Sequence, residues 1–202
     1  MKKYNIALIP INEGKSIIQC AKNFSSIAGQ YLLGEKSLPH VTLYQFMVDE
    51  SDIDNIWEKV FQSLEQHSIY LTFEKFSCIT FDEHVFWASL LPNHCDNLIK
   101  MHSSVSNTIN KPIKSNYDPH MTLINTKNKE YENLVNEFSK SYIPIQDTFV
   151  LSLGESDDIG QFTKLLYSYQ LHSKKSALLR NSVNIRARAR VRARARLFFS
   201  KN

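Results

Sequence analysis

A short pattern that occurs twice constrains the fold of this chain more than any other feature. Residues 39–43 read Pro-His-Val-Thr-Leu, and residues 119–123 read Pro-His-Met-Thr-Leu. Alternate residues of a β-strand point to the same side, so each copy would present an imidazole and a hydroxyl on one face and apolar side chains on the other. The two histidines are 80 residues apart, and there are only two copies. This spacing indicates duplication of a small α+β unit and not a solenoid array.

The secondary structure predicted around the two copies is also repeated. A helix precedes each motif strand, and a helix, a strand, a turn and another strand follow it. The predicted helices cover residues 16–31, 51–67, 93–109 and 129–141, and the predicted strands cover residues 4–11, 40–47, 69–73, 76–81, 84–91, 120–126, 143–153 and 162–171. Two such units related by a pseudo-twofold axis would place the motif strands on either side of one groove.

Charge divides the chain into two parts. Residues 1–171 contain 14 lysines, 20 acidic residues and no arginine, a net charge of −6, whereas residues 172–202 contain seven arginines, three lysines and no acidic residue, a net charge of +10. A hydrophobic content of 43% is enough to build a sizeable core. We therefore expect one domain over residues 1–171 and a separate basic tail over residues 172–202.

The tail is not expected to fold. Arginine alternates with alanine or valine over residues 186–196, which leaves no apolar face to bury, so we expect the tail to be disordered. Its positive charge would attract nucleic acid phosphates without sequence specificity and in a salt-dependent way. The alternative is an incidental extension with no binding role.

Three further features indicate the cellular setting. No uninterrupted apolar stretch approaches the roughly 20 residues of a membrane helix, and the N-terminal apolar run meets no signal cleavage site. Cys20, Cys78 and Cys95 have the spacing of neither a disulfide framework nor a zinc site. We therefore expect a cytoplasmic monomer with no membrane contact and no bound metal or cofactor.

The duplication changes the interpretation of the two histidines. A single histidine at the start of a strand is most often a hydrogen-bonded structural residue. Recurrence of the motif with matching flanking elements makes a shared catalytic role the better explanation for His40 and His120. An imidazole that titrates near neutral pH can act as a general base in one copy, while its protonated partner acts as a general acid in the other.

The paired motifs, HVTL at 40–43 and HMTL at 120–123, resemble those of the two-histidine (2H) phosphoesterase superfamily, which includes bacterial 2′-5′ RNA ligase homologues and cyclic nucleotide phosphodiesterases. The resemblance extends through the element order over residues 3–171. It implies an α+β, bilobal duplicated fold, in which two antiparallel-sheet lobes with outer helices surround a central cleft. It also implies action without a metal on a cyclic nucleotide phosphate or a 2′-5′ phosphodiester.

The same resemblance assigns His40, Thr42, His120 and Thr122 as the catalytic residues. In-line displacement at phosphorus requires the base and the acid on opposite sides, which a pseudo-twofold pair provides. The threonines would donate hydrogen bonds to the nonbridging oxygens, although each threonine alone would be read as an ordinary strand residue.

Three other residues are predicted to bind substrate. Tyr44 lies on the alternating face of His40 and Thr42, where it would stack on a base or pack against its lobe. Tyr117 would lie at the edge of the cleft. Lys114 would attract the substrate phosphate, or would remain a solvated loop lysine.

One departure from the family pattern bears on the substrate. Ligase-type members often carry an arginine shortly after the second motif, whereas here the motif is followed by Ile124, Asn125 and Thr126. This favours hydrolysis of a small substrate, such as a nucleoside 2′,3′-cyclic phosphate or an RNA terminus that carries one. The alternatives are 2′-5′ RNA ligase-like processing of RNA ends, and a non-catalytic RNA-binding module that uses the cleft and the basic tail.

Overall fold

The computed structural model describes residues 1–80, 84–93, 95–109 and 117–169. The strands are β1 (Lys2–Pro10), β2 (Val41–Val48), β3 (Ser68–Thr80), β4 (Phe86–Pro92), β5 (Met121–Thr126), β6 (Ile145–Ser156) and β7 (Phe162–Ser168). The α-helices are α1 (Gly14–Lys22), α2 (Ile53–Ser63), α3 (Asp96–Thr108) and α4 (Tyr131–Ser139). None of the described helices is long and apolar enough to cross a membrane.

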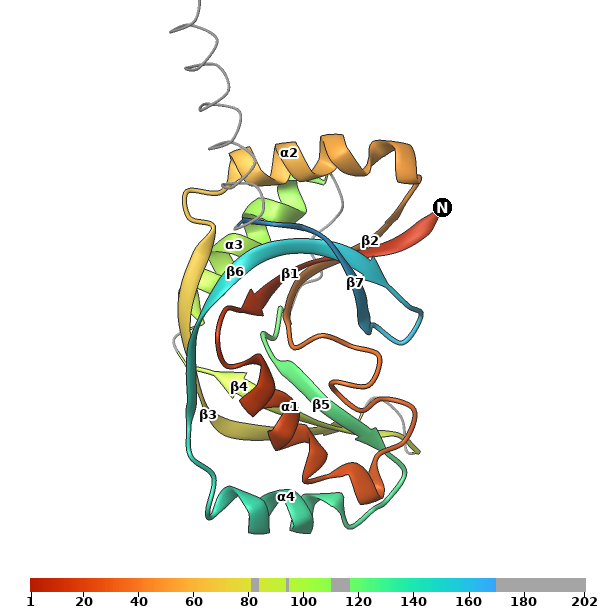
Figure 1. Ribbon diagram of the computed structural model, residues 1–202, viewed down its shortest axis with the longest axis vertical. Helices are drawn as coiled ribbons and strands as arrows, with labels where there is room; N and C mark the ends of the chain where they lie inside the picture. Colours follow the sequence, from red (N-terminus) through yellow and green to blue (C-terminus); the bar gives the residue numbers. More distant parts are fainter. Residues whose placement is uncertain (81–83, 94, 110–116, 170–202) are drawn as a thin grey trace, which may run out of the picture. The chain divides into compact units, whose positions relative to one another are not determined.

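All the strands belong to one antiparallel sheet with the order β2-β1-β6-β3-β4-β5, and β7 pairs with β6 (Figure 1). The predicted α+β class is therefore confirmed. Met1–Ser168 form one compact unit.

The two repeats exchange strands within this sheet. Each repeat has the order strand, helix, strand, helix, strand, so β1-α1-β2-α2-β3 corresponds to β4-α3-β5-α4-β6. β1, which pairs with β2 of the first repeat, also pairs with β6 of the second, while β4, which pairs with β5 of the second repeat, also pairs with β3 of the first. We call β1, β2, β6 and β7 with α2 and α3 the first lobe, and β3, β4 and β5 with α1 and α4 the second lobe.

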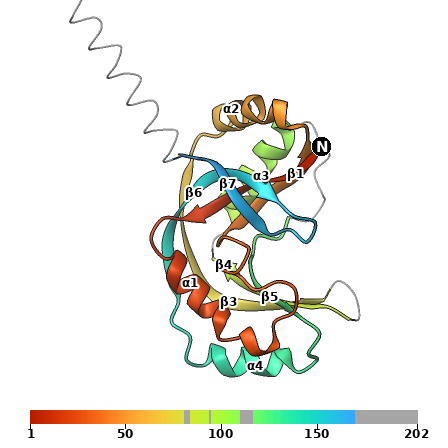
Figure 2. The same ribbon diagram turned by 45° about the vertical axis from the view of Figure 1, so that its right-hand side comes forward.

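The helices follow the same exchange. α3 of the second repeat contacts α2 and β2 in the first lobe, and α1 of the first repeat contacts β5 in the second lobe (Figure 2). α4 contacts β3 and β4. Each lobe therefore contains elements from both halves of the chain.

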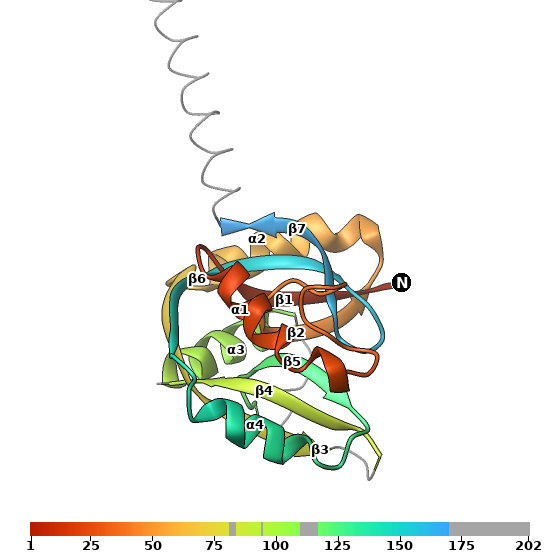
Figure 3. The same ribbon diagram turned by 60° about the horizontal axis from the view of Figure 1, so that its bottom comes forward.

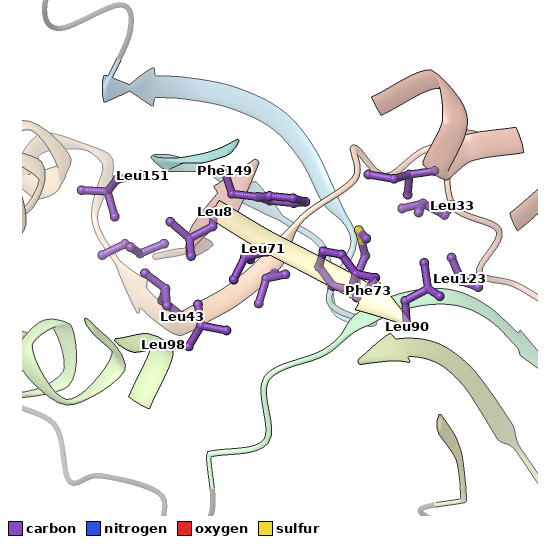
Figure 4. Close-up of a cluster of buried hydrophobic side chains, with 14 of the residues drawn as sticks. Leu8, Leu33, Leu43, Leu71, Phe73, Leu90, Leu98, Leu123, Phe149 and Leu151 are labelled. Carbon is purple, nitrogen blue, oxygen red and sulfur yellow. The ribbon is translucent and has the colours of Figure 1, made fainter. Parts of the chain in front are cut away.

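A single hydrophobic core runs through both lobes. Leu43 and Leu98 lie at its first-lobe end, Leu90 and Leu123 lie at its second-lobe end, and Phe149 lies between them (Figure 4). Phe149 is fully buried on β6, at the point where β1 and β3 flank this strand. The long strands β3 and β6 therefore make the two lobes one folding unit.

The first helix is shorter than the sequence predicts. The prediction of a helix over residues 16–31 is wrong beyond Lys22, where α1 ends. The chain that follows runs along the free edge of β5, where the Gly29 amide donates to the Asn125 carbonyl at 2.6 Å and the Leu33 amide donates to the Leu123 carbonyl at 2.9 Å (Figure 3). These tertiary hydrogen bonds satisfy backbone carbonyls at the edge of β5, and they outweigh the helical preference of the local sequence.

The strands predicted over residues 69–73 and 76–81 are one strand, β3. Its register shifts between Phe73 and Lys75, where its partner changes from β6 to β4. The predicted turn at residues 82–83 lies outside the described residues. The basic tail over residues 172–202 also lies outside them.

Both motif strands carry the same β-bulge. In the first lobe Thr42 pairs with Ala7 and Tyr44 pairs with Ile6, which leaves Leu43 without a partner residue. In the second lobe the pairs are Thr122 with Ser89 and Ile124 with Ala88, which leaves Leu123 without one. A bulge redirects the side chains that follow it. The duplication therefore extends to the register of the strands that carry the motifs.

Candidate active site

The four predicted catalytic residues line one cavity of about 200 Å³. β2 and the residue before it supply Thr42 and His40, and β5 with the residue before it supplies Thr122 and His120. The described residues around the cavity are Tyr31, His40, Thr42, Gln45, Ile79, Trp87, Ser89, His120, Thr122, Ile159 and Gly160. The fold therefore brings the two motifs together, as their duplication predicts.

The two imidazoles are held by the same backbone contact. His40 Nδ1 lies 2.7 Å from the carbonyl oxygen of Leu38, and His120 Nδ1 lies 2.8 Å from that of Asp118. A carbonyl only accepts, so Nδ1 carries the hydrogen in both rings, and a neutral ring has its lone pair on Nε2. In each motif the proline precedes the histidine, and the carbonyl two residues before the histidine fixes the tautomer. Nε2 of each ring is thereby left for a ligand in the cavity.

The environments of the two rings differ. His40 is only 6% exposed, whereas His120 is partly exposed. The pKa of His40 is lowered from 6.5 to about 4, mainly by burial and to a lesser extent by repulsion from His120, while its hydrogen bond to Leu38 opposes the shift. His40 is therefore neutral at pH 7. A phosphate anion between the rings would raise this pKa, because it favours the charged imidazole.

Tyr44 does not lie on the face predicted for it. The bulge at Leu43 turns the following residues, so Gln45 faces the cavity. The Tyr44 ring instead lies 6.0 Å from the ring of His102 on α3. The prediction that Tyr44 shares the face of His40 and Thr42 is wrong, because simple alternation fails at a bulge.

Tyr117 does not line the cavity either, but it contacts the first motif strand. Its hydroxyl donates to the Thr42 carbonyl at 2.8 Å, and its ring stacks on His102 at 4.2 Å. His102 Nδ1 in turn lies 2.7 Å from the Leu43 carbonyl. These side chains of the second repeat therefore hold the bulge of the first. Lys114, the third predicted substrate-binding residue, lies outside the described residues.

Several lining residues were not predicted from the sequence. Trp87 and Ser89 alternate on β4, the neighbour of β5, and Tyr31 comes from the segment along the free edge of β5. Tyr31 and Trp87 meet edge to face with ring centroids 5.9 Å apart. The alternation of Trp87 and Ser89 was a visible signal, but only the pairing of β4 with β5 shows that these residues flank Thr122.

The turn between β6 and β7 closes another side of the cavity with Ile159 and Gly160. Gly160 has a φ of +88°, which favours glycine, and its backbone comes close to the Gln45 side chain. Among the described lining residues there is no carboxylate, lysine or arginine. This described lining therefore contains no permanently charged side chain, and its two imidazoles are those of His40 and His120.

Comparisons with known proteins agree with this geometry. The model of the 2′-5′ RNA ligase superfamily matches residues 28–152, which include both motif strands and β4, the neighbour of β5. No curated protein matches the chain by sequence.

Solved structures with the same fold include apo LigT from E. coli, with a TM-score of 0.55 and 16% identity over 83% of this chain and 96% of LigT. LigT complexed with 3′-AMP gives a TM-score of 0.54 and 16% identity over 83% of this chain and 97% of that one. A protein described as a phosphoesterase gives a TM-score of 0.54 and 14% identity over 83% and 97% of the two chains. Together, the family match over more than half of the chain, the shared fold and the two facing motifs lead to one conclusion: the chain belongs to the 2′-5′ RNA ligase superfamily of two-histidine phosphoesterases.

Proposed function

We propose that this protein hydrolyses a small nucleotide 2′,3′-cyclic phosphate or a 2′-5′ phosphodiester without a metal, with His40 and His120 as the proton-transfer pair. One observation carries the proposal. Both imidazoles line the same cavity, and each has its Nδ1 held by a backbone carbonyl, so that Nε2 is free for substrate. Such a pair suits a reaction that takes a proton from one oxygen and gives a proton to another.

In the proposed reaction, the oxygen of a water molecule attacks phosphorus and loses its proton to the neutral imidazole. The bond from phosphorus to the opposite ribose oxygen breaks, and that oxygen takes a proton from the protonated imidazole. The burial that keeps His40 neutral suits the accepting role, and the more exposed His120 suits the donating role. Thr42 and Thr122 donate hydrogen bonds to the nonbridging oxygens, where negative charge is redistributed.

The charge of the cavity supports a small, singly charged substrate. The proposed mechanism starts with one neutral and one protonated imidazole, and this pair would carry a single positive charge that balances the single negative charge of a phosphodiester. The product is a phosphomonoester with a second negative charge at neutral pH, so the same cavity holds it less well. E. coli LigT has been solved in complexes with 3′-AMP and with phosphate, which favours a nucleotide phosphate as the ligand class.

The proposal is tested by assaying the purified protein against 2′,3′-cyclic nucleotides, 2′-5′ dinucleotides and RNA that ends in a cyclic phosphate. His40→Gln and His120→Gln should each lower turnover about a hundredfold or more. His67→Gln is the matched control, because this ring also contacts a backbone carbonyl, that of Phe61 at 2.7 Å, but lies away from the cavity. A chelator should leave the rate unchanged. Full activity in both cavity variants would rule out the proposed pair.

Two alternatives give different results in the same assays. A 2′-5′ RNA ligase would join ends in the reverse direction with the same two histidines, and product analysis would detect the new linkage. A non-catalytic RNA-binding module would retain salt-sensitive RNA affinity in both histidine variants and lose it on truncation after Gln170, which removes the arginines of residues 186–196. Hydrolysis predicts that this truncation leaves turnover unchanged.

A further inference from the structure

A buried asparagine on β1 makes a hydrogen bond to one of the cavity threonines. Asn5 is 0% exposed, and its Nδ2 donates to Thr42 Oγ1 at 3.0 Å. Asparagine is depleted in strands and is rarely buried at their centre. Its position therefore calls for a specific reason.

The other half of the same amide indicates a functional reason. Asn5 Oδ1 is buried and has no hydrogen-bond partner among the described residues. A buried carbonyl without a partner destabilises a fold, and such groups often mark functional sites. An apolar residue of similar size would avoid this loss of stability. The hydrogen bond from Asn5 Nδ2 to Thr42 is therefore the feature that explains an asparagine at this position.

The donor determines where the Thr42 hydroxyl points. A hydroxyl has one hydrogen, and when its oxygen accepts from an amide that hydrogen must be directed elsewhere. Thr42 lines the cavity, so the remaining direction leads to the ligand. We propose that Asn5 is a positioning residue, which orients the Thr42 hydroxyl to donate to a nonbridging phosphate oxygen. This inference rests on the proposed hydrolase function.

The second half-site is built differently at the equivalent position. Asn5 lies two residues before Ala7, which pairs with Thr42, and Trp87 lies two residues before Ser89, which pairs with Thr122. The position that holds Asn5 beside the first motif strand therefore holds Trp87 beside the second. The pseudo-symmetric pair is thus expected to donate unequally, with the Thr42 hydroxyl oriented in advance by the protein.

Asn5→Leu is the direct test, because leucine has a similar size and no hydrogen-bonding group. We expect kcat to fall about tenfold with KM within about twofold, since a donor is lost where charge develops in the transition state. The melting temperature should stay the same or rise, because the substitution removes the unpaired buried carbonyl. Asn5→Val provides the same comparison if the leucine variant does not fold. Unchanged or increased kcat would refute the inference, and an increase would mean that Asn5 accepts from the hydroxyl and withholds it from substrate.

A double-mutant cycle separates positioning from general damage to the lobe. Because Asn5 is proposed to act only through Thr42, Asn5→Leu should cause no further loss of kcat in a Thr42→Val background. In a Thr122→Val background its full tenfold loss should remain. Losses that multiply in both backgrounds would overturn the proposed role.

Ser152→Ala is the matched control, since Ser152 is also a buried polar residue, lies on β6 opposite Ala7, and does not line the cavity. This variant should keep its kcat. The outcomes also separate the two proposals. If the two histidine variants and Thr42→Val retain full activity, the proposed function fails. If those variants lose activity and Asn5→Leu does not, only the role of Asn5 fails.

Discussion

At the scale of single residues, the two proposed half-sites have the same motif but different environments. His40 is buried beside Phe162, with ring centroids 5.4 Å apart, whereas His120 is partly exposed. The backbone contact that sets the tautomer is the same in both. The motif therefore determines which nitrogen faces the cavity, and burial lowers the pKa of His40.

The low pKa of His40 predicts a specific loss of stability in acid. Between pH 6.5 and pH 4 the unfolded chain binds a proton at His40 that the folded chain does not bind, so falling pH favours unfolding. From pH 7 to pH 4 this residue should lower the free energy of unfolding by about 3 kcal/mol. Urea unfolding across this range, in the native protein and in His40→Gln, measures the difference.

The glutamine variant should lack this part of the pH dependence, because its side chain does not titrate. Its stability should therefore exceed that of the native protein most clearly near pH 4. Parallel stability curves for the two proteins between pH 7 and pH 4 would show that His40 keeps an ordinary pKa in the fold.

At the scale of elements, each motif strand depends on the other repeat. The bulges leave backbone groups of β2 and β5 outside the regular ladder. On β2, side chains of the second repeat donate to the carbonyls of Thr42 and Leu43, and on β5 the Leu33 amide of the first repeat donates to the Leu123 carbonyl. Unpaired buried carbonyls are destabilising, so these contacts hold each strand in the shape that the cavity requires.

Tyr117→Phe should therefore reduce catalysis without removing a cavity residue. The change keeps the stacked ring and removes the hydrogen bond to the Thr42 carbonyl. We expect kcat to fall about threefold to tenfold, because a small displacement of β2 moves His40 and Thr42 together. Steady-state kinetics on a 2′,3′-cyclic nucleotide measures this effect.

Tyr142→Phe is the control for this prediction. The Tyr142 hydroxyl also donates to a backbone carbonyl, that of Phe73 at 3.0 Å, and Tyr142 does not line the cavity. Both variants should lose about 1 kcal/mol of stability with the hydrogen bond, but only Tyr117→Phe should lose turnover. Equal kinetic effects would mean that the change acts through stability alone.

At the scale of the whole molecule, the exchange of strands joins the lobes. The first lobe includes β6 from the second repeat, and the second lobe includes β3 from the first repeat. Neither repeat can complete its own sheet, and one core extends through both lobes. The two half-sites are therefore held at a fixed separation by the same packing that stabilises the fold.

Unfolding of the two lobes should consequently be a single transition. The two tryptophans report on different lobes, since Trp57 lies on α2 and Trp87 on β4. Trp57→Phe and Trp87→Phe each keep one tryptophan. Within each variant, the urea transition followed by the remaining tryptophan should coincide with the transition followed by circular dichroism. Separate unfolding of one lobe within either variant, detected by circular dichroism, would contradict this expectation.

Phe149→Ala should destabilise both lobes together by about 3 to 5 kcal/mol, because it opens a cavity where β6 joins them. Ile143→Ala is the control, since this side chain is 82% exposed and should change stability by less than about 0.5 kcal/mol. A Phe149 variant that shifts the signal of only one tryptophan would show that the lobes unfold independently.

The local signals of the sequence predicted much of this fold. Apolar periodicity and turn residues predicted the order of strands and helices, and the repeated motif predicted that His40 and His120 face each other with their threonines. Local periodicity failed at the end of α1, along β3 and at Tyr44, where long-range hydrogen bonds or a change of strand partner decide the conformation.

By itself, the amino-acid sequence determined that this protein carries two copies of one motif, because a duplicated motif needs no knowledge of the fold to be recognised. Only the tertiary structure decided that the repeats exchange strands, that bulges turn Gln45 toward the cavity and Tyr44 away from it, and that Asn5 lies behind Thr42. These features depend on which strands pair and in what register. Pairing is a property of residues far apart in the chain, and burial, which makes His40 unlike His120, exists only once that pairing is complete.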